Sequence, residues 1–229
     1  MIGIIGNFIP FSLISWSEKY VQSNVAGLLL SVGPLFTIIL SHFLTKDDKF
    51  TFLKLISIVI GLAGALFIIG FDTILNLTSG ETKNLIPKIF IIIAALGYVI
   101  SSIIAYNIKN VDTISLTTFV TFSAAIISIP FMIYAEMNYP SKVNYNSIIA
   151  IVYLGLFPTA IAFQLRFHII SKAGPIFLSY VAYLIPVFAI IWGYIFLQEK
   201  INLEIIFGVV LVLFGVFISQ KKFSKNINE

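Results

Sequence analysis

The sequence contains no cysteine and few charged residues. Without cysteine the chain has no disulfide framework, no thiolate metal site and no cysteine nucleophile. Only 10% of the residues are charged, whereas soluble domains average about a quarter. This scarcity of charge excludes an ordinary soluble domain, and we expect no bound cofactor and no metal.

Motifs for hydrolytic catalysis are missing as well. The sequence has no HExxH metal-binding helix, no nucleophile turn around a serine and no pair of aspartates inside an apolar stretch. The chain is therefore not expected to be an enzyme. Its net charge of +4 is scattered between apolar runs, which does not form the basic patch of a nucleic-acid-binding protein.

Apolar residues are what the sequence has in abundance. They make up 59% of the chain, and the mean hydropathy is +1.04. Crossing the hydrocarbon core takes about 20 apolar residues as a helix. We therefore predict an all-α polytopic helix bundle in a lipid bilayer, with spans at roughly 2–17, 24–44, 51–70, 87–107, 114–135, 147–167, 175–197 and 202–219. The first span lacks a basic leader and a cleavage site, so it is expected to remain in the protein.

Lysine and arginine are unevenly distributed over the loops that join these spans. Nine of the 14 fall in loops on one side of the predicted bundle, and the other five fall on the opposite side. Because cytoplasmic loops carry the excess of positive residues, both termini are expected in the cytoplasm.

Two parts of the sequence repeat one another. A shift of 152 positions brings Pro34 onto Pro186, and each proline is followed two residues later by phenylalanine. With one extra residue in the first loop, Gly64 falls on Gly215, and an acidic-basic pair precedes each glycine. Equivalent helices are five positions apart in chain order, which is an odd number, so they cross the membrane in opposite directions. This inverted repeat is typical of transporters whose substrate site lies between the two halves.

Small and polar residues line one face of each proline-bearing helix, at spacings of three and four. Small and polar residues are enriched where membrane helices pack against protein and not where they face lipid, so both faces should contact protein or a cavity. The two stripes are formed by Gly27, Ser31, Pro34, Ile38 and Ser41, and by Ser179, Tyr183, Pro186, Ile190 and Gly193.

These segments resemble the drug/metabolite transporter superfamily, EamA type. The resemblance rests on GLLLSVGPLFTIILSHFL, on GLFPTAIAFQLRFHIISKAG, and on SYVAYLIPVFAIIWGYIFLQEK with the glycines that follow. It implies two inverted five-helix repeats that move small metabolites, amino acids or drugs out through the bacterial inner membrane. A homodimer is a further possibility for such a carrier.

The match to that pattern lacks the family's first two helices. It divides the chain into an incomplete first repeat over 1–70, a linker loop over 71–86, a second repeat over 87–220 and a cytoplasmic tail over 221–229. The alternative to a secondary transporter is a truncated, non-transporting subunit or fragment of such a carrier.

Uncharged polar and aromatic side chains are the groups most available to a small-molecule substrate. They suit amphipathic or zwitterionic solutes better than strongly charged ones. Each hydroxyl can instead bond to its own helix, and each aromatic ring can lie at the membrane interface. The predicted substrate-binding residues are Asn7, Trp16, Ser31, Pro34, Tyr98, Ser101, Thr159, Ser179, Tyr183 and Pro186.

Prolines and ionisable residues inside the spans have separate implications. Each proline frees one helix carbonyl for a substrate or a polar neighbour, and we favour a hinge or cavity role for Pro34 and Pro186. No ionisable residue lies at the middle of a predicted span, and Arg166 is expected to mark the cytoplasmic interface, with an anion-contacting role as the alternative. An uncoupled facilitator or exchanger fits these residues at least as well as a proton-coupled carrier.

Overall fold

The chain is a bundle of α-helices in a computed structural model. The structure describes residues 1–21, 23–46, 50–69, 85–108, 110–138, 144–184, 188, 195 and 203–220, and no strand occurs among them. The helical elements are η1 (Ile4–Phe8), α1 (Ile9–Ser17), α2 (Ser23–Leu30), α3 (Gly33–Leu44), α4 (Phe52–Ile69), α6 (Leu85–Asn107), α7 (Thr113–Asn138), α8 (Tyr145–Leu154), η3 (Gly155–Ile161), α9 (Ala162–Ser179) and α11 (Leu203–Gln220).

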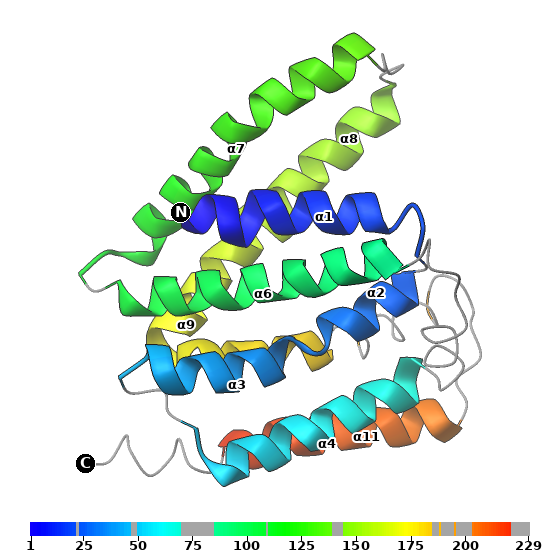
Figure 1. The fold of residues 1–229 in the computed structure, drawn as a ribbon, viewed down its shortest axis with the longest axis vertical. Helices are drawn as coiled ribbons and strands as arrows, with labels where there is room; N and C mark the ends of the chain where they lie inside the picture. Colours follow the sequence, from blue (N-terminus) through cyan, green and yellow to red (C-terminus); the bar gives the residue numbers. More distant parts are fainter. Residues whose placement is uncertain are drawn as a thin grey trace.

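Helix α6 is the centre of the bundle. It contacts η1 and α1 on one side and α2, α3 and α9 on others, while α4 and α11 form a separate close pair (Figure 1). The N-terminus and the end of α11 lie on the same side of the bundle, at the left of Figure 1. This placement agrees with an even number of crossings.

The predicted spans correspond to helices, although fewer are of full membrane length. Among the described residues, three helical segments are long and apolar enough to cross a membrane: Leu85–Asn107, Thr113–Asn138 and Tyr145–Ser179, the last of which contains the turn at Gly174. Ile4–Ser17, Gly33–Leu44, Phe52–Phe67 and Ile206–Gly215 are shorter apolar helices. The predicted span 175–197 is described at 175–184, 188 and 195. The tail 221–229 and the linker 71–86, except for the first two residues of α6, lie outside the described residues.

The predicted span over 24–44 is broken into two helices. Helix α2 ends at Leu30, Ser31 and Val32 form a turn, and α3 begins at Gly33 with a proline in its first turn. Proline is well tolerated there because the first turn of a helix needs no backbone N–H donors. The broken helix is the reason why this segment does not appear as one membrane-length span.

Two other prolines produce π-helical turns instead of breaks. Pro10 follows η1, where the N–H of Ile9 bonds to the carbonyl of Ile4, five residues back. Pro158 lies inside η3 and cannot donate to Leu154 O, four residues back. The hydroxyl of Thr159 donates to that oxygen at 2.9 Å. A polar neighbour therefore uses the carbonyl that this proline frees.

The helix that contains Arg166 is longer than its sequence predicts. It continues past the predicted end at residue 167 as far as Gly174, where the backbone turns with φ 85° and ψ 167°. Positive φ is unfavourable for residues with a Cβ, and Pro175 then starts the next helical turn. The Gly174–Pro175 pair therefore separates the sixth and seventh predicted spans.

Hydrogen-bonded turns begin α7 and α8 outside the apolar spans. Asp112 Oδ1 accepts from the N–H of Ser115 at 2.8 Å, and Asn144 Oδ1 accepts from the N–H of Ser147 at 2.8 Å. Hydrogen bonds from the side chain and backbone of Ser115 hold the pKa of the Asp112 carboxyl below its ordinary value. Both helices thus start at positions that the local sequence specifies.

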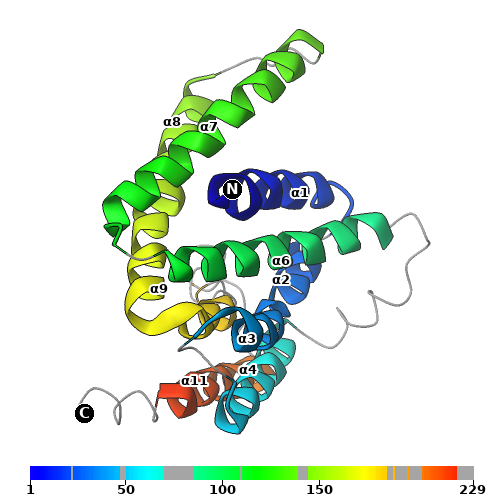
Figure 2. The same ribbon diagram turned by 60° about the vertical axis from the view of Figure 1, so that its left-hand side comes forward.

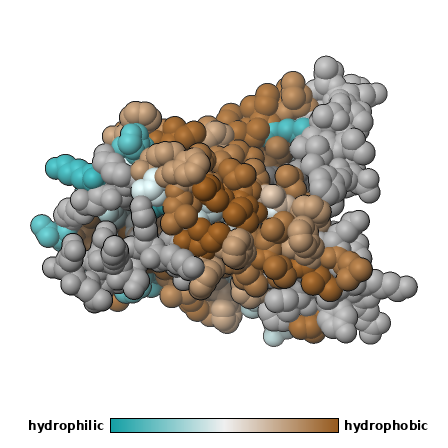
Figure 3. Space-filling view, turned by 90° about the horizontal axis from the view of Figure 1, so that it is seen from below, coloured by the Kyte–Doolittle hydropathy of each residue, from teal (hydrophilic) through white to brown (hydrophobic). Residues whose placement is uncertain are grey.

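Helices α7 and α8 diverge from the other helices (Figures 1 and 2). None of the residues of α8 is buried, and α7 buries only Thr117, Val120 and Ala124. The side chains that they expose are mostly apolar, and Figure 3 shows a largely apolar surface on another face of the molecule as well. Such surfaces are those of a protein surrounded by lipid.

Glycines allow α4 and α11 to cross at backbone contact. A Cβ at Gly64 would lie 2.7 Å from the carbonyl oxygen of Gly208, and a Cβ at Gly215 would lie 2.8 Å from that of Ser57. Atoms at these distances overlap, so only glycine fits at either position. Small residues allow this type of close packing between membrane helices.

These two contacts are equivalent under the internal repeat. The offset that brings Gly64 onto Gly215 also brings Ser57 onto Gly208. The pairs 64–208 and 57–215 are therefore exchanged by the repeat, and the contacts show that α4 and α11 run in opposite directions. The crossing thus has the symmetry that an inverted repeat requires.

We predict that Gly64→Ala destabilises the bundle by about 1 to 3 kcal/mol, because the added methyl meets backbone atoms that cannot rotate away. The measurement is the apparent melting temperature of the detergent-purified protein. Gly27→Ala is the matched control, because a Cβ at Gly27 meets nothing within 4 Å. Equal melting temperatures for Gly64→Ala and the wild type would contradict the close crossing.

Candidate functional site

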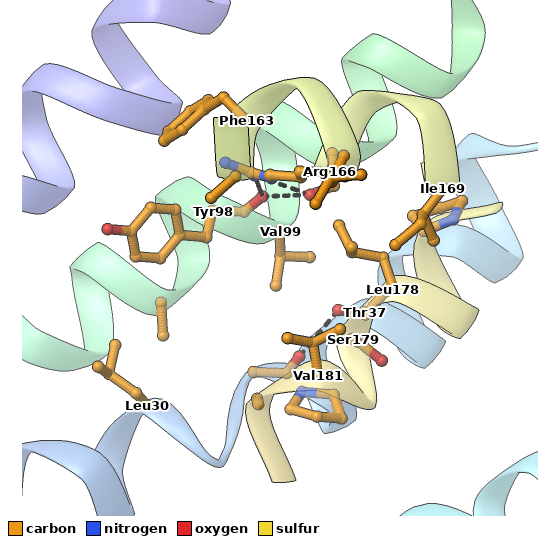
Figure 4. A pocket seen from close by; sticks show the side chains of 18 of the residues that line it. Leu30, Thr37, Tyr98, Val99, Phe163, Arg166, Ile169, Leu178, Ser179 and Val181 are labelled. Atoms are coloured by element: carbon orange, nitrogen blue, oxygen red, sulfur yellow. Dashed lines mark hydrogen bonds between the residues drawn. The ribbon is translucent and has the colours of Figure 1, made fainter. Parts of the chain in front are cut away.

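An open cavity of about 500 Å³ lies beside α6, between helices of the bundle. Its walls come from α1, from both halves of the broken α2–α3 segment, from α6, from η3 and from α9 (Figure 4). Elements of both predicted repeats therefore meet at one space. The volume is within the range of about 300 to 1,000 Å³ typical of small-molecule sites.

Most of the cavity wall is apolar. Phe11, Val99, Ile169 and Leu178 are among the residues that form it. The polar members are Thr37, Tyr98, Ser102, Arg166 and Ser179. Of the described residues around this space, only Arg166 carries a charge.

Arg166 extends from α9 toward α6 and η1. Its Nη2 donates to Ser101 Oγ at 2.7 Å, to Ser102 Oγ at 2.9 Å and to the carbonyl oxygen of Tyr98 at 3.0 Å. Its Nη1 lies 3.5 Å from the carbonyl oxygen of Gly6. Gly6 is four residues before Pro10, which has no N–H to donate to that carbonyl. The guanidinium therefore takes the place of a missing backbone donor.

Aromatic rings surround the same guanidinium group. Its central carbon lies 5.3 Å from the ring centroid of Phe163, 5.4 Å from that of Tyr98 and 5.8 Å from that of Phe167. Cations are attracted to aromatic faces at such distances. Rings and oxygens together hold Arg166 in one orientation.

Arg166 lies deeper in the bundle than the sequence interpretation placed it. Its partner Tyr98 is two residues past Leu96, the central residue of α6, which is a rise of about 3 Å. Arg166 itself precedes the turn at Gly174 by eight residues, or about 12 Å of helix. The expectation that it marks the cytoplasmic interface is wrong, because that expectation ended the helix at residue 167. An ionisable residue does lie within a span.

Three of the predicted substrate-binding residues line the cavity: Pro34, Tyr98 and Ser179. Ser101 does not line it but is one of the oxygens that hold Arg166. Asn7 and Thr159 line a second space of about 650 Å³ between α1, α7 and η3. The two spaces share Phe11 and Pro158 in their walls.

The other predicted residues lie elsewhere. Trp16 is 38% exposed and packs against Tyr20 and Phe90. Ser31 is buried, and its hydroxyl donates to its own helix at Gly27 O. Tyr183 is buried against α4 and lines neither space. Pro186 lies outside the described residues. A substrate contact for any of the ten residues stays a prediction.

Arg166 is the residue of the cavity wall whose position the sequence interpretation placed incorrectly. One signal was available: it is the only arginine of the chain, whereas the other 13 basic residues are lysines. The planar guanidinium holds several oxygens at once, which a lysine ammonium does not do in the same geometry. A lone arginine inside the apolar run AFQLRFHII therefore indicates a buried oxygen cluster.

An apolar helix bundle with an inverted repeat and a cavity between its helices is typical of multi-pass membrane transporters. The sequence profile of the EamA-like transporter family matches residues 1–70 and 85–220. The chain belongs to this family, a branch of the drug/metabolite transporter superfamily.

Relatives of known sequence cover nearly the whole chain. The uncharacterized transporter YoaV of Bacillus subtilis is 25% identical over 93% of this chain and 72% of its own length. The uncharacterized transporter YdfC of the same organism is 26% identical over 98% of this chain and 71% of its own length. An uncharacterized transporter of Archaeoglobus fulgidus is 24% identical over 96% of this chain and 76% of its own length. A solved crystal structure has the same fold, with a TM-score of 0.77 at 19% identity over 95% of this chain and 73% of the other.

We predict that Tyr183→Phe lowers stability and leaves the cavity unchanged. The Tyr183 hydroxyl donates to the carbonyl oxygen of Ile58 at 3.2 Å, so its loss should cost about 1 kcal/mol. The measurement is again the apparent melting temperature in detergent. Tyr145→Phe, on the exposed start of α8, is the control that should show no change. Loss of transport by Tyr183→Phe at unchanged stability would instead support a substrate contact.

Proposed function

We propose that the chain is a secondary transporter that moves small organic solutes out of the cell by alternating access. The observation that carries this proposal is the cavity beside α6, to which both repeats contribute walls. In transporters built from inverted repeats, the substrate site lies between the halves near the middle of the membrane. Membership of a transporter family supports the same conclusion.

The helix irregularities lie where a rocking motion of the two halves would need them. The break at Ser31 and Val32 leaves the N-terminus of α3 at the cavity wall, and the turn at Gly174 stands between Arg166 and Ser179. Hinges in domain motions are usually a few residues at the ends of elements. We therefore propose these two positions as the hinges.

The sequence supports the coupling, orientation and location that we propose. Asp and Glu are missing from the middle of every predicted span, so an exchanger or uncoupled facilitator is favoured over a carrier with an intramembrane acid. We place both termini in the cytoplasm and the bundle in the bacterial inner membrane. No catalytic step is assigned to the chain, whose relatives are named transporters.

The absence of cysteine allows a test that needs no known substrate. In the Ser179→Cys variant the only thiol lines the cavity, so alternating access exposes it to water from each side in turn. A membrane-impermeant maleimide should label it both in right-side-out and in inside-out vesicles.

Ser57→Cys is the matched control, because Ser57 is fully buried in the crossing of α4 and α11. It should remain unlabelled from either side. Labelling of Ser179→Cys from one side only would contradict alternating access and favour the non-transporting alternative.

A further inference from the structure

Arg166 has a positive charge that no acidic group in the described part of the chain balances. Its four hydrogen-bond acceptors are two hydroxyls and two backbone carbonyls, all neutral. Removing a cation from water without a paired anion is costly. Ionisable groups retained inside membrane spans therefore usually serve a substrate, an ion or a partner charge.

The two serine hydroxyls accept from Arg166 and have no proton to spare for another partner. Ser101 Oγ and Ser102 Oγ both donate to the carbonyl oxygen of Tyr98, at 2.9 and 2.8 Å. Their lone pairs therefore face the guanidinium. This arrangement lowers the cost of burying the charge, but it leaves the net charge of the cluster at +1.

Donor groups of Arg166 remain free for a ligand. A guanidinium has five N–H groups, and Nη2, which has two of them, faces all three of the short contacts. Nη1 has only the 3.5 Å contact to Gly6 O, and Nε has no hydrogen-bond partner in the part of the chain that the structure describes. An anion in the cavity could approach these donors without displacing the serines.

A second source of positive potential faces the same cavity. Gly33 and Pro34, the first two residues of the 12-residue α3, are in its wall. The N-terminus of a helix carries a partial positive charge, and broken membrane helices direct such ends at the anionic groups of substrates. Arg166 and the start of α3 therefore favour the same sign of ligand charge.

The rest of the wall restricts the ligand further. Val99, Ile169 and Leu178 offer only apolar surface, and Tyr98 and Phe163 add aromatic rings. A single arginine is neutralised by a single negative charge, whereas a dianion would leave one charge unpaired among apolar groups. Both features favour an amphipathic monoanion.

We infer that this cavity binds a small organic monocarboxylate, with the carboxylate at Arg166 and the apolar body against Val99, Ile169 and Leu178. The inference rests on the proposed transport function, because it names the class of solute that the carrier moves. It replaces the expectation, drawn from uncharged side chains alone, of a substrate without a strong charge.

A pair of ligands with the same shape and different charge tests the inference directly. The probes are radiolabelled 3-phenylpropanoate and 3-phenylpropanamide, and their binding to the full chain in detergent is measured by equilibrium dialysis at neutral pH. The carboxylate should bind at least about tenfold more tightly than the amide, since hydrogen bonds to a charged group are worth more than neutral ones. Equal affinity, or no binding of the carboxylate, would overturn the inference.

Variants then assign the preference to Arg166. Arg166→Gln should abolish the difference between carboxylate and amide, and Arg166→Lys, which keeps the charge, should retain part of it. Lys172→Gln removes an exposed charge from the same helix, outside the cavity wall, and should leave the difference unchanged. A preference that survives in Arg166→Gln would show that this residue serves packing only.

Further outcomes distinguish a monoanion site from a dianion site, and distinguish the anion site from the proposed transport mechanism. Phenyl phosphate, largely a dianion at neutral pH, should compete more weakly than 3-phenylpropanoate, and stronger competition would overturn the monoanion assignment. If Arg166→Gln fails to fold, the wild-type ratio and Arg166→Lys still decide. If the carboxylate binds selectively but Ser179→Cys is labelled from one side only, alternating access is refuted and the anion site is retained. If Ser179→Cys is labelled from both sides but the carboxylate and the amide bind equally, the anion site is refuted and alternating access is retained.

Discussion

Inside a bilayer every backbone carbonyl must find a donor within the protein. At two proline-containing turns of this bundle, a side chain supplies the donor that the backbone lacks. Pro158 frees Leu154 O, and the Thr159 hydroxyl donates to it. Pro10 frees Gly6 O, and Arg166 approaches it from another helix. The first solution is local, whereas the second ties η1 to α9. One of the contacts of the arginine is thus made at the turn of a proline 156 residues earlier in the chain.

The oxygen cluster around Arg166 connects three parts of the fold. Tyr98, Ser101 and Ser102 come from the central helix α6, Gly6 from η1, and the guanidinium from α9. The same cluster is part of the wall of the cavity, so the group that holds these helices together also sets the charge of the site. A movement of α9 relative to α6 would change the shape and the potential of the cavity at once.

The crossing of α4 and α11 is a contrasting interface. It depends on backbone approach at Gly64 and Gly215. Since the two contacts are exchanged by the repeat, a substitution on either helix should disturb the same geometry. Tyr183 packs over Gly61 beside this crossing, and its hydroxyl bonds to α4. This contact joins two helices, so it differs from a hydroxyl that bonds to its own helix and from a ring at the membrane interface.

Composition and periodicity by themselves determined that the chain is a helical membrane bundle, where most of its helices begin and end, and that its two parts repeat one another in opposite directions. These properties follow from local hydropathy, prolines and glycine spacing, which are visible in one dimension. Only the tertiary structure decided which polar groups meet. Ser31 and Ser179 occupy similar stripes and both hydroxyls bond to their own helices, but Ser179 also lines the cavity and Ser31 does not. Arg166 seemed to end a helix, yet it lies among oxygens from two other elements, because contacts between helices depend on rotation, depth and crossing that no single segment encodes.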